Sequence, residues 1–380
     1  MNWRIALSDI DLAEADIAAV GDVLRSKWLT MGAVTQQFER EFAAYCGVKH
    51  AVAVANCTVG LHLAYAALGL GPGDEVIMPA LTFVATANAL LAAGGVPVFA
   101  DVAGLDDLTI DPAAIEAAIT PRTRAITVMH YGGYPCRMEP IRELARRHNL
   151  RVIEDAAHAP GASLGGAKAG ALGDLACFSF FSNKNLATGE GGMVTTDDDA
   201  LAERVRLLRS HGMTTLTWDR HRGHASSYDV VAAGFNYRID EMRSALGISQ
   251  LAKLDANNER RAALVARYRE ALDGIPGLIV PFAEHPGQSA YHLMPVVLPS
   301  AAARAHVMQA FREAAIQTSM HYPPIHTFSA YREQYAGANL PNTEAAGERE
   351  LTLPLHPLLT PEDVDLVAET LRAALGTAPR

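Results

Sequence analysis

The middle of the chain gathers side chains whose types and spacing could do chemistry on a carbonyl compound. Asp155 ends an apolar run, RVIED, and His158 follows three residues later. Ser179 lies within CFSFF, and Lys184 precedes a glycine-rich turn at 189–192. A lysine that loses water beside such a turn becomes less basic and can attack a carbonyl carbon to form a Schiff base. An aspartate held beneath a pyridine ring would suit its protonated nitrogen.

The elements that must position these residues alternate over residues 50–200. Apolar runs such as AVAVA, EVIMPA, VPVFADV, RAITVMH and RVIED predict strands, and the longer segments between them predict helices. Strands this apolar are buried on both faces, which indicates a parallel sheet covered by helices. Asp155 then lies at the carboxyl edge of the sheet, where open α/β folds bind ligands. LACFSF and GGMVTT predict two more strands around the polar loop SNKNLATGE.

The C-terminal part of the chain has a different pattern. Residues 239–272 predict one long helix or two consecutive ones, and the strand-like YHLMPVVL and helices at 301–315 and 361–375 follow. We therefore predict a large domain over residues 1–250 and a smaller α+β domain over residues 251–380. The first 30 or so residues are expected to pack on the small domain or on a partner chain, and their sequence does not decide between the two.

Composition narrows the classes of function. The 380 residues are 49% hydrophobic and 19% charged, which predicts ordered globular domains, and the net charge of −10 disfavours nucleic acid and acidic membranes as partners. The four cysteines are scattered without metal-ligand spacing, so neither a disulfide framework nor a metal site is expected. The N-terminus has acids where a signal peptide has basic residues, and no window approaches the ~20 apolar residues of a membrane helix. We expect a soluble, cytoplasmic protein.

Three ordered motifs carry a family resemblance: VIEDAAHAPGA, GDLACFSFFSNKNLATGEGGMVTTDD and GFNYRIDEMRSALG, with GDEVIMPALTFVATANA upstream. The chain resembles the DegT/DnrJ/EryC1/StrS family of pyridoxal phosphate (PLP)-dependent sugar aminotransferases from Ser26 to near Leu353. The resemblance implies the fold-type I architecture, an α/β fold with a large, mostly parallel sheet between helices and a smaller α+β C-terminal domain.

The resemblance also implies a role for each residue that matches a motif. Lys184 would form the Schiff base with PLP and later move a proton between substrate and cofactor. Asp155 would hold the pyridine nitrogen protonated, His158 would contact the ring hydroxyl and Phe83 would stack on the ring. The phosphate would be held by Ser179, Thr58, the backbone amides of Cys57 and Thr58 and, from the second subunit of a homodimer, Asn236. Two positions depart from the common pattern: His158 stands where glutamine is frequent, and Cys57 where glycine is frequent.

Two further segments are candidates for substrate binding. Arg220 and Arg222 lie in TWDRHRGHASSYD, which predicts either a loop that recognises an anionic donor or acceptor, or an ordinary solvated loop. MHYPPIHTFSAYRE contains Tyr322 and His326, and the resemblance implies that this region lines the sugar pocket.

The predicted function is the transfer of an amino group from L-glutamate or L-glutamine to a keto group of a nucleotide-linked sugar, in two half-reactions through pyridoxamine phosphate. Four alternatives are weighed against it. A free ketocyclitol is a second acceptor class, and a non-catalytic PLP-binding regulator would show a degraded site. Relatives that act as dehydratases have histidine in place of the Schiff-base lysine, so Lys184 argues against that activity. A dinucleotide-binding oxidoreductase needs GxGxxG after the first strand, and the sequence there is ANCTVG.

Overall fold

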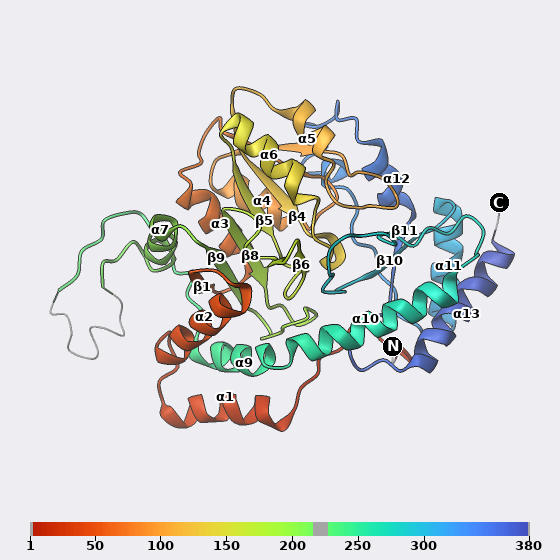
Figure 1. The fold of residues 1–380 in the computed structure, drawn as a ribbon, viewed down its shortest axis with the longest axis horizontal. Coiled ribbons are helices and arrows are strands. Elements are labelled where there is room, and N and C mark those ends of the chain that lie inside the picture. The colour runs from red at the N-terminus through yellow and green to blue at the C-terminus, as the bar shows by residue number, and fades with distance from the viewer. Residues whose placement is uncertain (1–2, 216–226, 379–380) are drawn as a thin grey trace.

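A seven-stranded sheet forms the centre of the protein in a computed structural model, which describes residues 3–215 and 227–378 (Figure 1). The strand order is β1-β9-β8-β5-β4-β2-β3. β9 is antiparallel to both of its neighbours, and the other adjacent pairs are parallel. This is the α/β architecture predicted from the alternating pattern. The strands are β1 (His50–Val54), β2 (Glu75–Pro79), β3 (Val96–Ala100), β4 (Thr123–Met129), β5 (Arg151–Asp155), β8 (Leu175–Ser179) and β9 (Gly192–Thr196).

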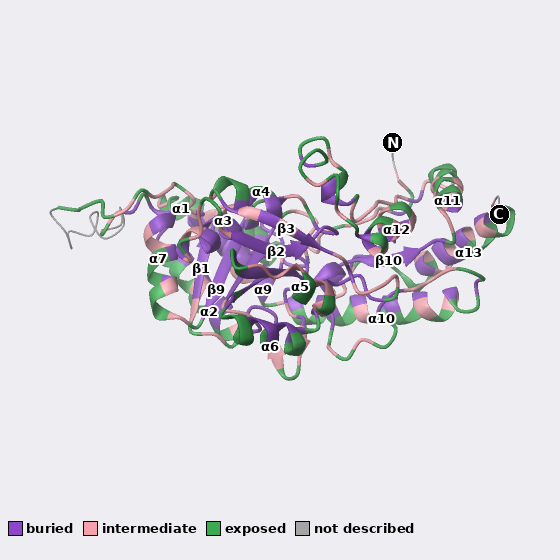
Figure 2. Cartoon of the chain, turned by 90° about the horizontal axis from the view of Figure 1, so that it is seen from above, coloured by how far each residue is buried: buried purple, intermediate pink, exposed green. Residues whose placement is uncertain are grey.

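Helices cover both faces of this sheet, which explains why its strands are apolar at nearly every position. Val52 and Val54 of β1 pack in the core on one face, and Ala51 and Ala53 pack in the core on the other. Successive strand residues point to opposite faces, so both sets are buried only in a three-layer arrangement (Figure 2). One face is covered by α3 (Cys57–Ala67), α4 (Ala85–Ala92) and α7 (Asp199–Arg209), and the other by α2 (Ala33–Cys46), α5 (Pro112–Ala118), α6 (Met138–His148) and α9 (Glu241–Leu251).

The strand ends place the functional residues. β5 and β8 are adjacent and parallel, so Asp155 and Ser179, their last residues, lie at the same carboxyl edge. The reversed strand β9 begins at this edge, where Gly192 pairs with Ser179. The loop between β8 and β9, which contains Lys184, therefore leaves and re-enters the sheet at the edge where Asp155 ends.

The helical pattern of residues 239–272 is two consecutive helices, α9 and α10 (Leu254–Leu272). α10 extends from the sheet domain to a second core at the other end of the molecule (Figure 1). There it packs with α11 (Ala301–Glu313), α13 (Pro361–Thr377) and the antiparallel pair β10 (Met294–Val297) and β11 (Glu350–Leu353). α9 ends at Leu251, and the domain boundary after residue 250 stays a prediction. The short hairpin β6 (Ser163–Leu164) and β7 (Ala167–Lys168) and the helix α12 (Pro341–Arg349) complete the described fold.

The N-terminal segment contacts both parts of the chain. The backbone of Ile5 bridges to that of Ile316, and its side chain is buried in the small-domain core. Helix α1 (Glu14–Ser26) packs on α9, so it lies along the sheet domain (Figure 1). Within the chain, Ile5 therefore packs in the small-domain core, and packing of the N-terminal segment on a partner chain stays a prediction.

No helix within the described ranges is both long and apolar enough to cross a membrane.

Candidate active site

A cavity of about 390 Å³ opens at the carboxyl edge of the sheet, and we call it the lysine cavity. Most of the residues predicted to bind the cofactor line it: Cys57, Thr58, Phe83, Asp155, His158, Ser179 and Lys184. Tyr322, predicted to bind the substrate, also lines it. The remaining lining residues include Asn56, Phe181, Asn183, Glu190 and His321. Residues from the first turn of α3, from two strand ends and from the small domain therefore meet at one place.

Lys184 is held in this cavity by a loop that is braced internally. Its own amide donates to the carbonyl of Phe181 (2.8 Å), and Thr188 donates to the carbonyl of Phe180 (2.8 Å). Burial lowers the pKa of Lys184 to about 8, while the nearby carboxylate of Asp155 acts in the opposite direction. The fraction of neutral amine near pH 8 is therefore far larger than for an ordinary lysine, which favours attack on a carbonyl.

Asp155 is only 3% exposed, and its carboxylate is already oriented. The hydroxyl of Thr86 donates to Oδ2 (2.6 Å) and the amide of Ala157 donates to Oδ1 (3.2 Å). Burial raises the pKa of Asp155, and these two donors and Lys184 oppose the rise. A cation placed against this carboxylate would offset the cost of burying it, which is the role that a protonated pyridine nitrogen would fill.

His158 carries the clearest sign of a missing partner. The ring is buried, its Nε2 lies 2.9 Å from the hydroxyl of Tyr322, and its Nδ1 has no hydrogen-bond partner among the described residues. Buried ring nitrogens are normally satisfied, so a ligand hydroxyl fits this position. Burial and the charge of Lys184 lower the pKa of His158, which keeps the ring neutral.

The end of the cavity beside α3 suits an anion. Asn56 caps this helix by accepting from the amide of Val59 (3.0 Å), and the amides of Cys57 and Thr58 in the first turn have no intrahelical acceptor. The thiol of Cys57 is directed to the carbonyl of Cys177 (3.5 Å), so its side chain does not obstruct those amides. Gly192 allows the helix to sit this close, because a Cβ there would lie 2.8 Å from the amide nitrogen of Cys57.

Phe83 completes the fit to a planar, phosphorylated cofactor. Its ring is 54% exposed although it lines the cavity, and it lies 5.9 Å from the ring of Tyr322. An exposed aromatic face at this position can stack on a flat ring. The amine, the carboxylate, the unsatisfied imidazole and the helix N-terminus thus match the aldehyde, ring nitrogen, hydroxyl and phosphate of PLP.

Comparisons with known proteins agree with this geometry. The sequence model of the DegT/DnrJ/EryC1/StrS aminotransferase family matches residues 10–372. The chain belongs to this family. It is 44% identical over 368 residues to the spore coat polysaccharide biosynthesis protein SpsC of Bacillus subtilis, with 95% of this chain and 94% of SpsC covered.

Two solved structures extend the comparison. DesI, crystallised in the presence of its TDP-sugar product, superposes with a TM-score of 0.88 at 34% identity and covers 99% of this chain and 94% of its own. The putative sugar aminotransferase Spr1654 of Streptococcus pneumoniae, in its PLP form, has a TM-score of 0.89 at 28% identity and covers 99% of this chain and 98% of its own. This chain is therefore a PLP-dependent aminotransferase of fold-type I.

Two of the predicted site residues, Asn236 and His326, do not line the lysine cavity of this aminotransferase. Asn236 is exposed, forms a backbone bridge with Ser210 and is not among the residues that line the cavity of its own chain. His326 is buried with its Nε2 3.1 Å from a carboxylate oxygen of Glu344, and it does not line the cavity. Arg220 and Arg222 lie outside the described residues.

His292 is a site residue that the sequence analysis missed. It precedes β10, and its Nε2 lies 3.4 Å from the amine of Lys184. Its ring centroid is 4.4 Å from that of His158. The apolar pattern of YHLMPVVL predicts a strand and gives no reason to single out His292. The one feature of the sequence that could have pointed to a site residue is the imidazole directly before that strand.

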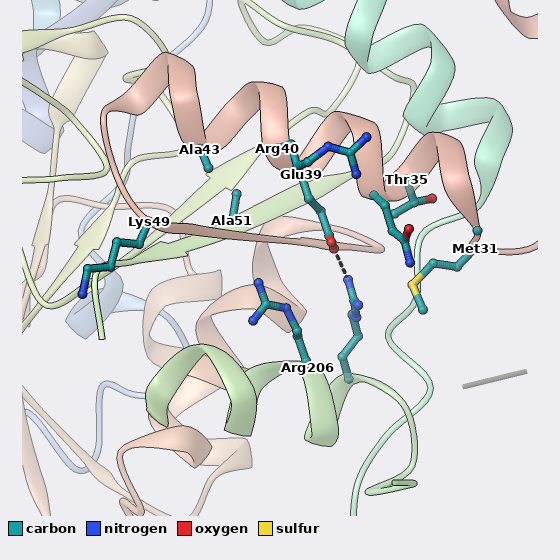
Figure 3. Close-up of a pocket in the computed structure, with 11 residues that line it drawn as sticks. Met31, Thr35, Glu39, Arg40, Ala43, Lys49, Ala51 and Arg206 are labelled. Atoms are coloured by element: carbon teal, nitrogen blue, oxygen red, sulfur yellow. Dashed lines mark hydrogen bonds and ion pairs between the residues drawn. The ribbon is translucent and has the colours of Figure 1, made fainter. Parts of the chain in front are cut away.

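A second cavity, of about 300 Å³, lies between α2, β1 and α7, and we call it the arginine pocket (Figure 3). Glu39 forms an ion pair with Arg209 at its centre (2.5 Å). The side chains of Arg40, Lys49 and Arg206 point in different directions in Figure 3. These cations do not converge on one point, so the pocket is not arranged to hold one ligand.

Proposed function

We propose that this aminotransferase moves an amino group from L-glutamate or L-glutamine to a keto group of a nucleotide-linked sugar. The observation that carries the proposal is the amine of Lys184, made less basic by burial, in a cavity that it shares with the oriented carboxylate of Asp155. The sugar acceptor is supported by relatives, since SpsC acts in polysaccharide biosynthesis by its name and DesI was crystallised with a TDP-sugar product.

Each residue of the lysine cavity has a task in this proposal. When bound, PLP supplies an aldehyde that links to amines and a ring that accepts an electron pair. Lys184 links to the aldehyde and, once released, carries a proton at Nζ between substrate carbon and cofactor. Asp155 holds the ring nitrogen protonated, His158 holds the ring hydroxyl and Phe83 covers the ring face. Thr58, Ser179 and the first-turn amides of α3, including that of Cys57, hold the phosphate.

The first experiment is the visible absorption spectrum of the purified protein with PLP, before and after L-glutamate or L-glutamine is added. We expect a visible band that disappears with at least one donor, and no such band in Lys184→Ala. The aminated protein is then offered a nucleotide-linked 3-keto or 4-keto sugar and, separately, the free ketocyclitol scyllo-inosose. Return of the band with the cyclitol alone would replace the proposed acceptor. Absence of the band in the wild type would contradict the role of Lys184.

We further propose that the enzyme works as a homodimer in which Asn236 binds the phosphate in the partner's cavity. Asn236 is exposed and does not line its own lysine cavity, which is compatible with a role in a partner's cavity. Mixing inactive Lys184→Ala and Asn236→Ala chains tests this, because a mixed dimer would contain one cavity with both residues intact. Activity that returns on mixing supports the shared site, and no return contradicts it.

A further inference from the structure

Among the described residues, the hydrogen-bond partner of the reactive amine comes from the small domain. His292 Nε2 lies 3.4 Å from Lys184 Nζ, and the two residues are 108 positions apart in the chain. His292 is 5% exposed, so its ring is fixed by packing and has little access to water. Whether His292 donates or accepts in this contact depends on which of its two ring nitrogens carries the hydrogen.

A chain of hydrogen bonds answers that question. Asn258 donates its side-chain NH₂ to the carbonyl of Pro160 (2.9 Å), which leaves its oxygen facing Asn185. The NH₂ of Asn185 then donates to that oxygen (2.8 Å) and to the carbonyl of Ala290 (2.6 Å). If this amide were flipped, an oxygen would face two acceptors. The Oδ1 of Asn185 is therefore the atom that faces His292.

The orientation of Asn185 determines the tautomer of His292. Asn185 Oδ1 lies 2.9 Å from His292 Nδ1, and an amide oxygen can only accept, so Nδ1 carries the hydrogen. Burial, together with the positive charge of Lys184, lowers the pKa of His292 well below its usual range, and the ring is neutral. A neutral ring with its hydrogen on Nδ1 has a lone pair on Nε2. That lone pair faces the amine of Lys184.

We propose that His292, oriented by Asn185, is a positioning residue that accepts a hydrogen bond from the amine of Lys184 and directs its lone pair into the cavity. One N–H bound to His292 restricts rotation of the amine at the end of a flexible side chain, which favours attack in one direction. The same bond stabilises the protonated amine, which is the form that carries the proton during the reaction.

Several other groups face Lys184 and contribute to its protonation. They are Asp155 on β5, Cys57 on α3, His158 after β5 and His321 from the small domain. Asp155 and Cys57 act to raise the pKa of Lys184 and burial acts to lower it. Variants of His292 and Asn185 leave these four residues in place. A change in the titration of Lys184 in such variants can therefore be assigned to the His292 contact.

The test measures the amine directly in the cofactor-free protein. Acetic anhydride acetylates neutral amines, and mass spectrometry then gives the acetylation rate of Lys184 as a function of pH. In the wild type we expect a midpoint near pH 8. His292→Phe removes the acceptor but keeps a planar ring, so the midpoint moves down by roughly one pH unit. His292→Gln offers a new acceptor and restores most of the shift.

Asn185→Leu is the second variant, and it leaves His292 itself unchanged. Without the acceptor at Nδ1 the ring can place its hydrogen on Nε2, which then repels a protonated amine. We expect the midpoint to move down here as well. The exposed Lys27 is the internal control, and its acetylation should be the same in every variant. An unchanged midpoint in folded His292→Phe, or equal shifts in the Phe and Gln variants, overturns the proposal.

The inference rests on the proposed role of Lys184, and the two can fail separately. The visible band with PLP, absent in Lys184→Ala, tests the role of Lys184. The acetylation profile needs no cofactor and tests only the contact with His292. In the loaded enzyme, His292→Phe should lower kcat by about tenfold with little change in the KM for the donor, because positioning of the amine and not donor binding is lost.

Discussion

The lysine cavity and the arginine pocket both contain buried cations, but only one of these cations has its charge paired. Arg209 is 3% exposed and binds a carboxylate oxygen of Glu39 (2.5 Å) and the carbonyl of Ala53 (2.6 Å). Lys184 has no carboxylate within ion-pair distance in the described part of the chain, and its nearest partner is a neutral imidazole at 3.4 Å.

This difference separates a structural charge from a reactive one. A buried cation that binds an anion and a backbone carbonyl holds elements together, in this case α2, β1 and α7. A buried cation without such a partner loses its proton more easily and keeps a lone pair available. Of these two cavities, the lysine cavity is the one whose described lining combines open space with a lysine of lowered pKa, which is why the chemistry is assigned there.

The largest expected effect is the loss of activity in Lys184→Ala. The variant removes the nucleophile, so kcat should fall on the order of a thousandfold or more. Lys49→Ala in the arginine pocket is the matched control, since the side chain of Lys49 is 63% exposed and its amine lies 4.0 Å from a carboxylate oxygen of Asp199. Steady-state kinetics of both variants test the comparison. Equal activities in the two variants would show that the cavities had been assigned incorrectly.

Arg209→Leu is expected to lower the stability of the fold and to leave the activity nearly unchanged. Removing one partner of a buried ion pair leaves Glu39 without its cation, and the free energy of unfolding should fall by about 3 to 5 kcal/mol. The activity per folded molecule should remain close to that of the wild type. Urea denaturation measures the loss, with Arg206→Leu as the control for a cation that lies in the same pocket but forms no ion pair with Glu39. A loss below about 1 kcal/mol would mean that the Glu39–Arg209 pair behaves like a surface pair.

A third, smaller effect is expected in Asp155→Asn. The amide keeps the shape, and its single oxygen can still accept from the backbone amide of Ala157 while its NH₂ faces the hydroxyl of Thr86, but it no longer has a negative charge to hold a protonated ring nitrogen. We expect kcat to fall on the order of a hundredfold while cofactor binding persists. Thr86→Val should cost much less, because the carboxylate retains its charge and one donor. Asn and Val variants of equal activity would contradict the role of charge.

The sequence predicted the sheet and the position of Asp155 because both depend on local pattern. The apolar runs could only be strands buried on both faces, and a residue that ends such a strand lies at the carboxyl edge. The pattern of residues 239–272 predicted helix with a possible break, but it did not locate the break between α9 and α10. Motif resemblance added the roles of Lys184 and His158, which periodicity alone does not reveal.

Contacts between the domains could not be predicted in this way. Tyr322, predicted to bind the substrate, lines the lysine cavity, and the 2.9 Å contact of its hydroxyl with His158 was not predicted. His326, four residues later, pairs with Glu344 outside the cavity. Their segment contains two prolines and has no periodicity, so nothing local indicates which side chains face the sheet. The contact of His292 with Lys184 depends likewise on how the small domain docks.

The last prediction concerns pH and follows from the lowered pKa of Lys184. Only the neutral amine reacts with the PLP aldehyde, so the rate at which cofactor-free protein takes up PLP should rise about tenfold per pH unit below 8 and level off above it. With an unshifted pKa of 10.5 the rate would continue to rise to that pH. Stopped-flow absorbance between pH 6 and about 10.5 measures the profile, and a plateau only near the upper limit would contradict the lowered pKa. The lowered pKa of Lys184 also fixes the direction in which stability changes with pH. Between pH 8 and 10.5 the unfolded chain binds a proton at Lys184 that the folded chain has released, so the free energy of unfolding should rise with pH across that window. Lys184→Met removes the proton and therefore this part of the slope, whereas Lys49→Ala, in the arginine pocket, should leave it intact.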